Sequence, residues 1–355
     1  MTHAAPPQPT IGVFDSGFGG LTVLRALFHL LPSARYLYLG DTARLPYGSK
    51  SRETIARYAV SSARFLLEGG ADLLVIACNT ATALALEDIR SAAAPIPVLG
   101  VIEPGAEAAA KAVSQTPSVV LSETRIPFRT DAFTTPIPAG RKSLLASNVT
   151  LSGAKIPHMS LAAPREPASQ PPQTGPERPP HAPATVLVLA TAATVQSAAY
   201  TQALASLGVG AIEKACPLLV PLVEEGWIDH PVTREVARIY LAEALAEARA
   251  QNVPQDFTLT TLLLGCTHYP LLRPLLEQTL ASLGHPLHVI DSATATAEAA
   301  ATLLPPGPTP VPLKPISPTP ACTFYATDSV GKFQTLGSRF LGQPLPEVHL
   351  IDLGG

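Results

Sequence analysis

Eight short runs of apolar residues, separated by longer stretches of helical character, constrain the fold of this chain more than any other feature of its sequence. Each run is apolar throughout instead of alternating with polar residues, which is typical of strands buried on both faces by helices. The pattern therefore predicts an α/β fold with mostly parallel sheets. The runs are Ile11–Phe14, Tyr36–Leu39, Leu73–Ala77, Val98–Val101, Val186–Ala190, Leu259–Leu264, Leu287–Ile290 and Cys322–Ala326.

Two of the helical stretches have well-marked compositions or ends. Ser51–Glu68 opens on a serine suited to an N-cap and stops at two glycines, Gly69 and Gly70. Val232–Gln251 is rich in alanine, leucine, glutamate and arginine, which favour helix. Helices of this kind, placed between buried strands, are what a doubly wound sheet requires.

Proline is concentrated in two segments of the chain. Of its 38 prolines, 13 lie between Ser114 and Pro183, and 8 more lie between Pro305 and Pro320. Each proline removes a backbone donor and disfavours helix in the residue before it. We therefore expect 114–183 to be a long, mobile insertion and 305–320 an extended loop. A small Pro-rich subdomain over 114–183 is the alternative that the sequence leaves open.

Charge and composition exclude several classes of function. Charged residues make up 14% of the chain and the net charge is −3, so nucleic acid is not an expected partner. The start, MTHAAPPQPT, does not resemble a signal peptide, and no apolar run is long enough to span a membrane. The four cysteines include no CxxC pair, so we expect reduced thiols in the cytoplasm.

Two of these cysteines follow predicted strands in similar segments, which hints at two related halves. Cys78 comes after the run at Leu73 and is followed by Asn79 and Thr80, while Cys266 comes after Leu264 and is followed by Thr267 and His268. Ligands of open α/β sheets bind at the carboxyl ends of strands. We expect the positive end of a following helix to lower the pKa of each thiol towards neutrality.

Other interpretations of the cysteines are also open. Either cysteine can serve simply as a small buried apolar residue. A zinc site formed by Cys78, Cys266 and His268 is conceivable, although no ligand pair is close in sequence and no fourth ligand is evident. We therefore predict no metal.

Three further segments belong with the cysteines. Asp15-Ser16-Gly17-Phe18-Gly19-Gly20 leads from the first strand into a helix, and its glycines would let the backbone approach an anion such as a carboxylate. A tight turn without a ligand is the alternative. The segment around Tyr47 and Gly48 supplies a phenol and backbone N–H groups, and the segment from Cys216 to Gly226 places Glu224 behind an apolar run.

In order along the chain, IGVFDSGFGGLTVLRAL, GDTARLPYGSKS, ACNTATALAL, PVLGVIEPGA, LATAATVQSAAY, ACPLLVPLVEEG and LGCTHYPLL resemble the motifs of the glutamate racemase family. The C-terminal FYATDSVGKFQTLGSRFLG is similar to the family's last strand and helix. The insertion 114–183 and Ala293, where the family usually has glycine, depart from the family pattern.

The resemblance implies two pseudo-symmetric, doubly wound α/β domains with the active site at their interface. It places one domain at 1–103 plus 291–355 and the other at 104–290, which would contain the insertion. It further implies an isomerase that interconverts L- and D-glutamate without a cofactor and supplies D-glutamate for bacterial peptidoglycan and cell-wall synthesis. The partner is then a small molecule, and a homodimer is a further expectation.

By the same resemblance, Cys78 takes the α-proton from D-glutamate and Cys266 takes it from L-glutamate. Asp15 assists the first thiol and His268 assists the second. The substrate-binding residues implied by the resemblance are Asp15, Ser16, Tyr47, Gly48, Asn79, Thr80, Thr191, Glu224, Thr267 and His268. A racemase for aspartate or another acidic amino acid, and a binding protein that keeps the fold without turnover, remain alternatives.

Overall fold

The computed structural model describes residues 8–115, 184–250, 259–304 and 320–354. The chain divides into a first unit, 1–124 with 181–355, and a second unit, 125–180, which lies outside the described residues. The predictions for 114–183 and 305–320 fall outside the described residues as well, apart from their ends. One of those ends needs correction, because Ser114 and Gln115 complete a helix, α4 (Ile102–Gln115), instead of beginning an insertion.

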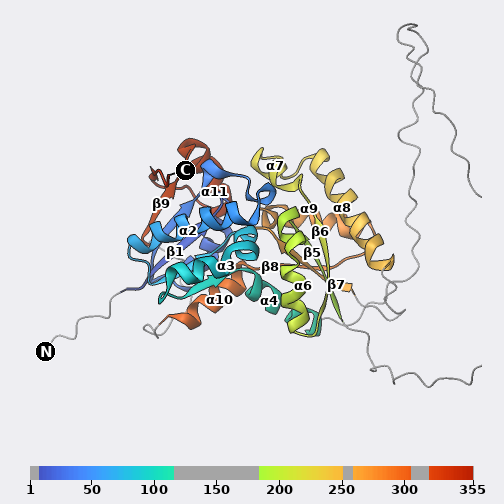
Figure 1. Cartoon of the computed structure of the whole chain (residues 1–355). Helices are drawn as coiled ribbons and strands as arrows, with labels where there is room; N and C mark the ends of the chain where they lie inside the picture. Colours follow the sequence, from blue (N-terminus) through green and yellow to red (C-terminus); the bar gives the residue numbers. More distant parts are fainter. Residues whose placement is uncertain (1–7, 116–183, 251–258, 305–319, 355) are drawn as a thin grey trace, which may run out of the picture. The chain divides into compact units, whose positions relative to one another are not determined.

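The larger sheet has the strand order β10-β9-β2-β1-β3-β4, and all of its neighbouring pairs are parallel (Figure 1). Its two central strands are β2 and β1, and β1 is flanked by β2 and β3. The strands are β1 (Thr10–Asp15), β2 (Arg35–Gly40), β3 (Leu73–Ile76), β4 (Val98–Gly100), β9 (Cys322–Ala326) and β10 (Val348–Leu350).

The smaller sheet has the order β6-β5-β7-β8 and is also parallel throughout. Its strands are β5 (Thr185–Ala190), β6 (Gly210–Ala215), β7 (Leu259–Gly265) and β8 (His288–Asp291). The predicted α/β class with mostly parallel sheets is therefore confirmed. All eight apolar runs form strands, with ends that differ from the predicted ones by one residue or so.

Helices cover both faces of each sheet. On the larger sheet, Ile11 and Val13 of β1 pack with α1, α10 and α11, whereas Phe14 packs with α2 and α3. On the smaller sheet, Val186 and Val188 of β5 pack with α4 and α6. The further helices are α1 (Leu21–Leu30), α2 (Arg52–Glu68), α3 (Asn79–Ala93), α5 (Ala192–Ser197), α6 (Ala199–Ser206), α7 (Leu219–Glu224), α8 (Pro231–Ala250), α9 (Arg273–Ser282), α10 (Ala293–Leu303) and α11 (Val330–Leu341).

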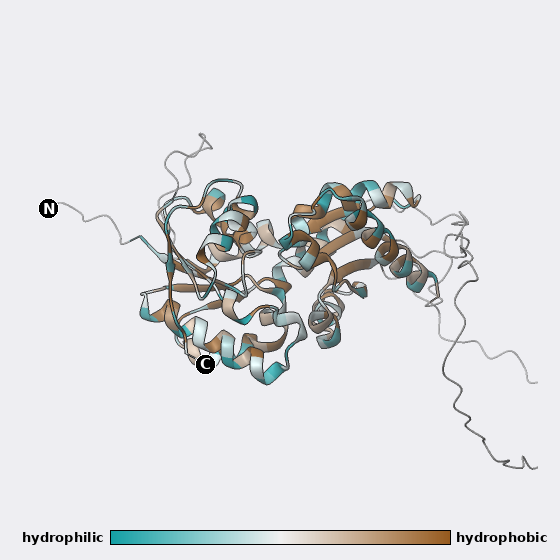
Figure 2. Ribbon diagram, turned by 90° about the horizontal axis from the view of Figure 1, so that it is seen from above, coloured by the Kyte–Doolittle hydropathy of each residue, from teal (hydrophilic) through white to brown (hydrophobic). Residues whose placement is uncertain are grey.

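The distribution of hydropathy follows this layered arrangement. Figure 2 shows the strands as mostly hydrophobic and the surrounding helices as mixed, as expected for strands enclosed between helical layers. Within the described ranges, no helix is both long and apolar enough to cross a membrane.

The predicted ends of α2 are confirmed. Ser51 is its N-cap and accepts a hydrogen bond from the Thr54 N–H at 3.4 Å, and the helix stops at Gly69. Two strands, β6 and β10, were not predicted. Only Ile212 of β6 is fully buried, because β6 is an edge strand and includes Glu213 and Lys214, so it carries no continuous apolar signal.

Candidate active site

The carboxyl edge of the larger sheet brings Asp15 and Cys78 to neighbouring positions. Asp15 is the last residue of β1, and Cys78 follows β3 by two residues. The strands pair in parallel with Phe14 opposite Ile76, so both side chains emerge at the same edge. This is the edge at which open α/β sheets bind ligands.

The smaller sheet offers an equivalent edge. Thr191 directly follows β5, and Cys266 directly follows β7. These two strands are neighbours, with Ala190 opposite Gly265. The sheet therefore places Thr191 and Cys266 side by side at its own carboxyl edge.

Hydrogen bonds between residues from the two edges show that the edges meet. Thr80 Oγ1 lies 3.0 Å from Thr191 Oγ1, and the Tyr200 hydroxyl donates to Asn79 Oδ1 at 2.5 Å. Cys78 and Cys266 are both buried, and a charge on Cys266 is among the causes that raise the pKa of Cys78. The two thiols predicted from the sequence thus belong to one site.

Cys78 is the N-cap of α3, where its Sγ accepts the Ala81 N–H at 3.4 Å and donates to Ser16 Oγ at 3.4 Å. The prediction that its pKa is lowered is wrong. Burial, and then the charge of Asp15, raise the pKa of Cys78 to about 12, and the two hydrogen bonds offset this only in part. The positive end of the helix is present, but burial destabilises the thiolate more than the helix end stabilises it.

Cys266 has a different setting from the one predicted. No α-helix follows it directly, because a four-residue 3-10 turn, Tyr269–Leu272, precedes α9. The predicted neighbour of the thiol is confirmed, since His268 Nδ1 lies 3.9 Å from Cys266 Sγ. The polar group beside this thiol is therefore an imidazole.

His268 lies within a chain of charged groups. Its Nε2 is 3.3 Å from Glu224 Oε1, and Glu224 Oε2 is 3.5 Å from Lys332 Nζ on α11. Burial alone would lower the pKa of His268. Its hydrogen bonds to Cys266 and Glu224, helped by the charges of Cys266 and Asp15, outweigh burial and raise that pKa to about 10. Imidazolium is therefore the form of His268 at neutral pH.

We expect Glu224→Gln to move the pKa of His268 down towards its ordinary value of 6.5, because the carboxylate that favours imidazolium is removed. NMR titration of the histidine rings measures the shift. His285 is the matched control, since burial and the charge of Arg249 lower its pKa without any contribution from Glu224. An unchanged pKa for His268 would show that Glu224 does not stabilise the imidazolium.

The same shift makes stability depend on pH. The pKa of His268 is higher in the folded protein than its ordinary value, so its contribution to stability is complete below about pH 6.5. That contribution is lost as the pH rises through about 10.

Two buried polar atoms of the site have no hydrogen-bond partner among the described residues: Asp15 Oδ1 and Asn79 Nδ2. The other Asp15 oxygen, Oδ2, accepts the Gly17 N–H at 2.9 Å. Burial raises the pKa of Asp15, although the charge of His268 opposes this. Unpartnered buried atoms are costly, so one acceptor and one donor at a single site point to a ligand with both kinds of group.

The phenol of Tyr47 bonds to Asp41, the residue that directly follows β2. The buried Tyr47 hydroxyl donates to Asp41 Oδ2 at 2.6 Å, and burial together with Asp41 raises the pKa of Tyr47. The hydroxyl proton of Tyr47 is therefore already engaged in a hydrogen bond within the protein. Gly48 lies against Thr191, because a Cβ at Gly48 would be 3.2 Å from Thr191 Cβ.

Gly19 has a steric task that its motif does not reveal. A Cβ built on Gly19 would lie 2.2 Å from Thr267 Oγ1 and 2.6 Å from His268 Nδ1. The loop after β1 thus passes directly over the residues that follow Cys266. The sequence predicted an anion cradle here, but the close approach to Thr267 and His268 is itself sufficient reason for glycine.

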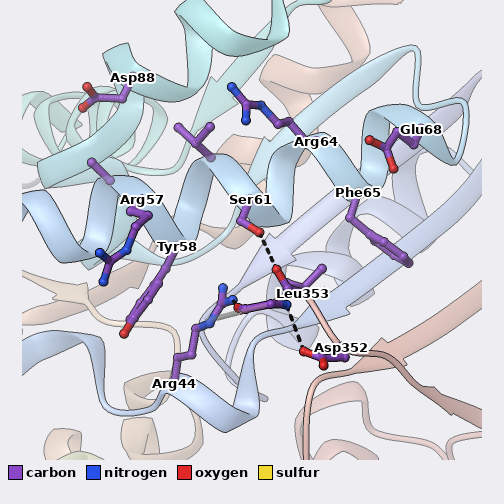
Figure 3. Close-up of a pocket in the computed structure, with 13 residues that line it drawn as sticks. Arg44, Arg57, Tyr58, Ser61, Arg64, Phe65, Glu68, Asp88, Asp352 and Leu353 are labelled. Carbon is purple, nitrogen blue, oxygen red and sulfur yellow. Dashed lines mark hydrogen bonds between the residues drawn. The ribbon is translucent and has the colours of Figure 1, made fainter.

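A cavity of about 610 Å³ lies elsewhere, between α2 and the C-terminal segment (Figure 3). Ser61 donates to the Leu353 carbonyl at 3.3 Å across it, and the Arg44 guanidinium lies 4.5 Å from the centre of the Tyr58 ring. Neither cysteine lines this cavity. Within the part of the chain that is described, no cluster of three or more histidine, cysteine or acidic side chains could hold a metal ion.

Comparisons with known proteins agree with this geometry. Residues 11–135 and 180–300 match the sequence profile of the Asp/Glu/Hydantoin racemase family. The chain is 43% identical to a glutamate racemase of Koribacter versatilis, with 98% of this chain and 99% of that protein covered.

Solved structures are similar over nearly the whole chain as well. A glutamate racemase of Francisella tularensis in complex with D-glutamate has a TM-score of 0.64 at 26% identity, with 98% of each chain covered. One of Thermus thermophilus in complex with β-chloro-D-alanine has a TM-score of 0.63 at 31% identity, with 99% of each chain covered.

Proposed function

Because this chain belongs to the Asp/Glu/Hydantoin racemase family, we propose that it is a glutamate racemase in which Cys78 and Cys266 transfer the proton. The observation that carries the proposal is the placement of two buried thiols at two sheet edges that meet, together with an unpartnered acceptor on Asp15 and an unpartnered donor on Asn79. An amino acid supplies the matching groups, an ammonium for the acceptor and a carboxylate for the donor.

Racemisation needs a base and an acid on opposite faces of the α-carbon. One cysteine, as thiolate, takes the α-proton, and its S–H bond forms as the C–H bond breaks. The electron pair left on the α-carbon then takes the proton of the other cysteine, which becomes a thiolate. Each turnover thus exchanges the protonation states of the two cysteines without any oxidant or cofactor.

The raised pKa of Cys78 supports one resting state. At neutral pH Cys78 is a thiol, and the His268 imidazolium lies 3.9 Å from Cys266 Sγ. This arrangement suits removal of the proton from L-glutamate by Cys266. For D-glutamate, a substrate ammonium beside Asp15 would offset the carboxylate charge that opposes ionisation of Cys78.

The polar residues around the thiols would hold the rest of the amino acid. We assign this task to side chains and backbone at the two sheet edges: Asp15, Ser16, Tyr47, Gly48, Asn79, Thr80, Thr191 and Thr267. Glu224 has a different role in our proposal from direct contact with glutamate, because its two oxygens already face His268 and Lys332. It would keep His268 charged.

We extend the proposal to the domains, the cellular location and the assembly of the enzyme. We propose that residues 1–103 with 291–355 form one domain around the larger sheet, and 104–290 the other around the smaller one. All four cysteines are free, and a mechanism with two thiols requires them reduced, so we place the enzyme in the cytoplasm. D-glutamate would supply peptidoglycan synthesis. A homodimer is the expected assembly, to be checked by sedimentation.

The function is tested by circular dichroism of L-glutamate solutions incubated with the protein. We expect loss of the signal without added pyridoxal phosphate and in the presence of a chelator. Alkylation of the thiols should abolish this activity, and D-glutamate should protect against alkylation, because substrate covers both sulfurs.

L-aspartate serves as the matched control substrate. Turnover of aspartate but not glutamate would favour the alternative of an aspartate racemase. Full activity after mass spectrometry shows both Cys78 and Cys266 alkylated would contradict the mechanism with two thiols.

A further inference from the structure

The side-chain amide of Asn79 has a hydrogen-bonded oxygen and an unpartnered nitrogen. Its Oδ1 accepts the Tyr200 hydroxyl at 2.5 Å, whereas its Nδ2 has no partner among the described residues. Both residues are buried: Asn79 is 3% exposed and Tyr200 is 0% exposed. Asn79 directly follows Cys78 at the start of α3, and Tyr200 comes from α6 beside the smaller sheet.

Tyr200 is held in a narrow slot. A Cβ on Gly265 of β7 would lie 2.8 Å from the Tyr200 ring, and a Cβ on Gly105 of α4 would lie 3.6 Å from its hydroxyl. Gly265 thus makes room for this ring, whereas the distance from Gly105 to the hydroxyl is an ordinary contact. Burial raises the pKa of Tyr200, so the hydroxyl keeps its proton and acts as a donor.

A primary amide can turn by half a rotation and exchange its oxygen for its nitrogen. If Asn79 turned, its NH2 would face the Tyr200 hydroxyl, and the phenol proton would lose its acceptor in a buried place. Leaving a buried donor unpaired is costly, so the phenol selects the orientation with Oδ1 towards Tyr200. The NH2 is then kept on the opposite side.

We infer that Tyr200 is a positioning residue, which turns the Asn79 NH2 into the active site so that it donates to a carboxylate oxygen of the amino-acid substrate. This inference rests on the proposed function. It accounts for a tyrosine at the end of the segment LATAATVQSAAY whose hydroxyl bonds to Asn79 instead of to a thiol. It also explains how Asn79 and Asp15 present groups of opposite character.

The test is Tyr200→Phe, measured as kcat and KM for both enantiomers. Without the phenol the amide is no longer fixed, so we expect KM to rise about fivefold to tenfold, the equivalent of one hydrogen bond, with kcat little changed. Because the enantiomers have equal free energy, kcat/KM must fall equally for both. An unchanged KM would overturn the inference.

Tyr36→Phe is the matched control. Tyr36 is equally buried, and its hydroxyl donates to the backbone carbonyls of Leu27 and Leu31, away from the site. A purely structural hydroxyl lowers the melting temperature without moving KM. If the two variants changed KM alike, the effect of Tyr200 would be structural and the inference would be wrong.

A double-mutant cycle distinguishes action through Asn79 from any other route. In the Asn79→Ala background, Tyr200→Phe should leave KM unchanged, whereas two independent effects would add. Asn79→Asp is a second arm that keeps the acceptor for Tyr200 but replaces the donor with oxygen. It should weaken D-glutamate binding, measured by calorimetry, by more than tenfold, and unaltered binding would overturn the inference.

These outcomes are separable from failure of the proposed function. If the unaltered protein racemises no glutamate, the proposed function fails before any variant is compared. If it racemises glutamate and the cycle is additive, only the role of Tyr200 fails.

Discussion

Cys78→Ser and Cys266→Ser should each lower the rate of glutamate racemisation by on the order of a thousandfold, because every turnover uses one thiol as base and the other as acid. The two variants should still differ from each other. Cys78→Ser retains Cys266 and its His268, so any exchange of the α-hydrogen with deuterated water should favour L-glutamate. Cys266→Ser should favour D-glutamate.

The measurement is mass spectrometry of recovered glutamate, with Cys322→Ser as the matched control. Cys322 is half-buried on β9 of the larger sheet, and its thiol donates to the Thr323 carbonyl at 3.8 Å instead of to a residue of the active site, so racemisation should be retained. Exchange of both enantiomers at equal rates by either active-site variant would refute the assignment of one cysteine to each face. Racemisation near the wild-type rate would refute it as well.

Gly19→Ala should lower kcat/KM by on the order of 100-fold, because its methyl group would need the space held by Thr267 Oγ1 and His268 Nδ1. Thr267 directly follows Cys266, so displacing Thr267 would also disturb the position of this thiol. The variant should fold, since the added methyl conflicts with side chains and not with backbone. Steady-state kinetics with a melting curve separates the two effects.

Gly331→Ala is the control for this substitution. Gly331 lies in α11, and a Cβ there meets nothing within 4 Å, so neither activity nor stability should fall. If Gly19→Ala retained full activity, the close approach of the first loop to His268 would have no part in positioning the imidazole.

The strands that hold the site were predictable because burial on both faces leaves a continuous apolar signal. β1, β3 and β7 have this signal, and the positions of Asp15, Cys78 and Cys266 follow from where those strands end. Edge strand β6 lacks the signal because most of its side chains are only partly buried.

The pKa shifts of the site residues were less predictable from the sequence than the positions of these residues in the fold. A helix end is a local property that a sequence reveals, and it favours a thiolate at Cys78. Burial and the nearby Asp15 carboxylate depend on the packed structure, and they reverse the direction of the pKa shift. For the same reason the sequence did not reveal Tyr200, which is 121 residues away from Asn79, or Lys332 as the partner of Glu224.

Both thiols are buried, with Cys78 5% exposed and Cys266 6% exposed. In the proposed mechanism this burial would let the free enzyme keep the protonation state that its last turnover left. In that mechanism, release of one enantiomer leaves the proton on the sulfur opposite to the one that carried it before, and bulk water has little access to move it back. After releasing D-glutamate, the free enzyme would therefore differ from the resting state in which Cys78 is the thiol, and it would be competent only for D-glutamate until the proton returned. When one enantiomer is in large excess, the return of the proton to the first sulfur would become a separate step of the catalytic cycle.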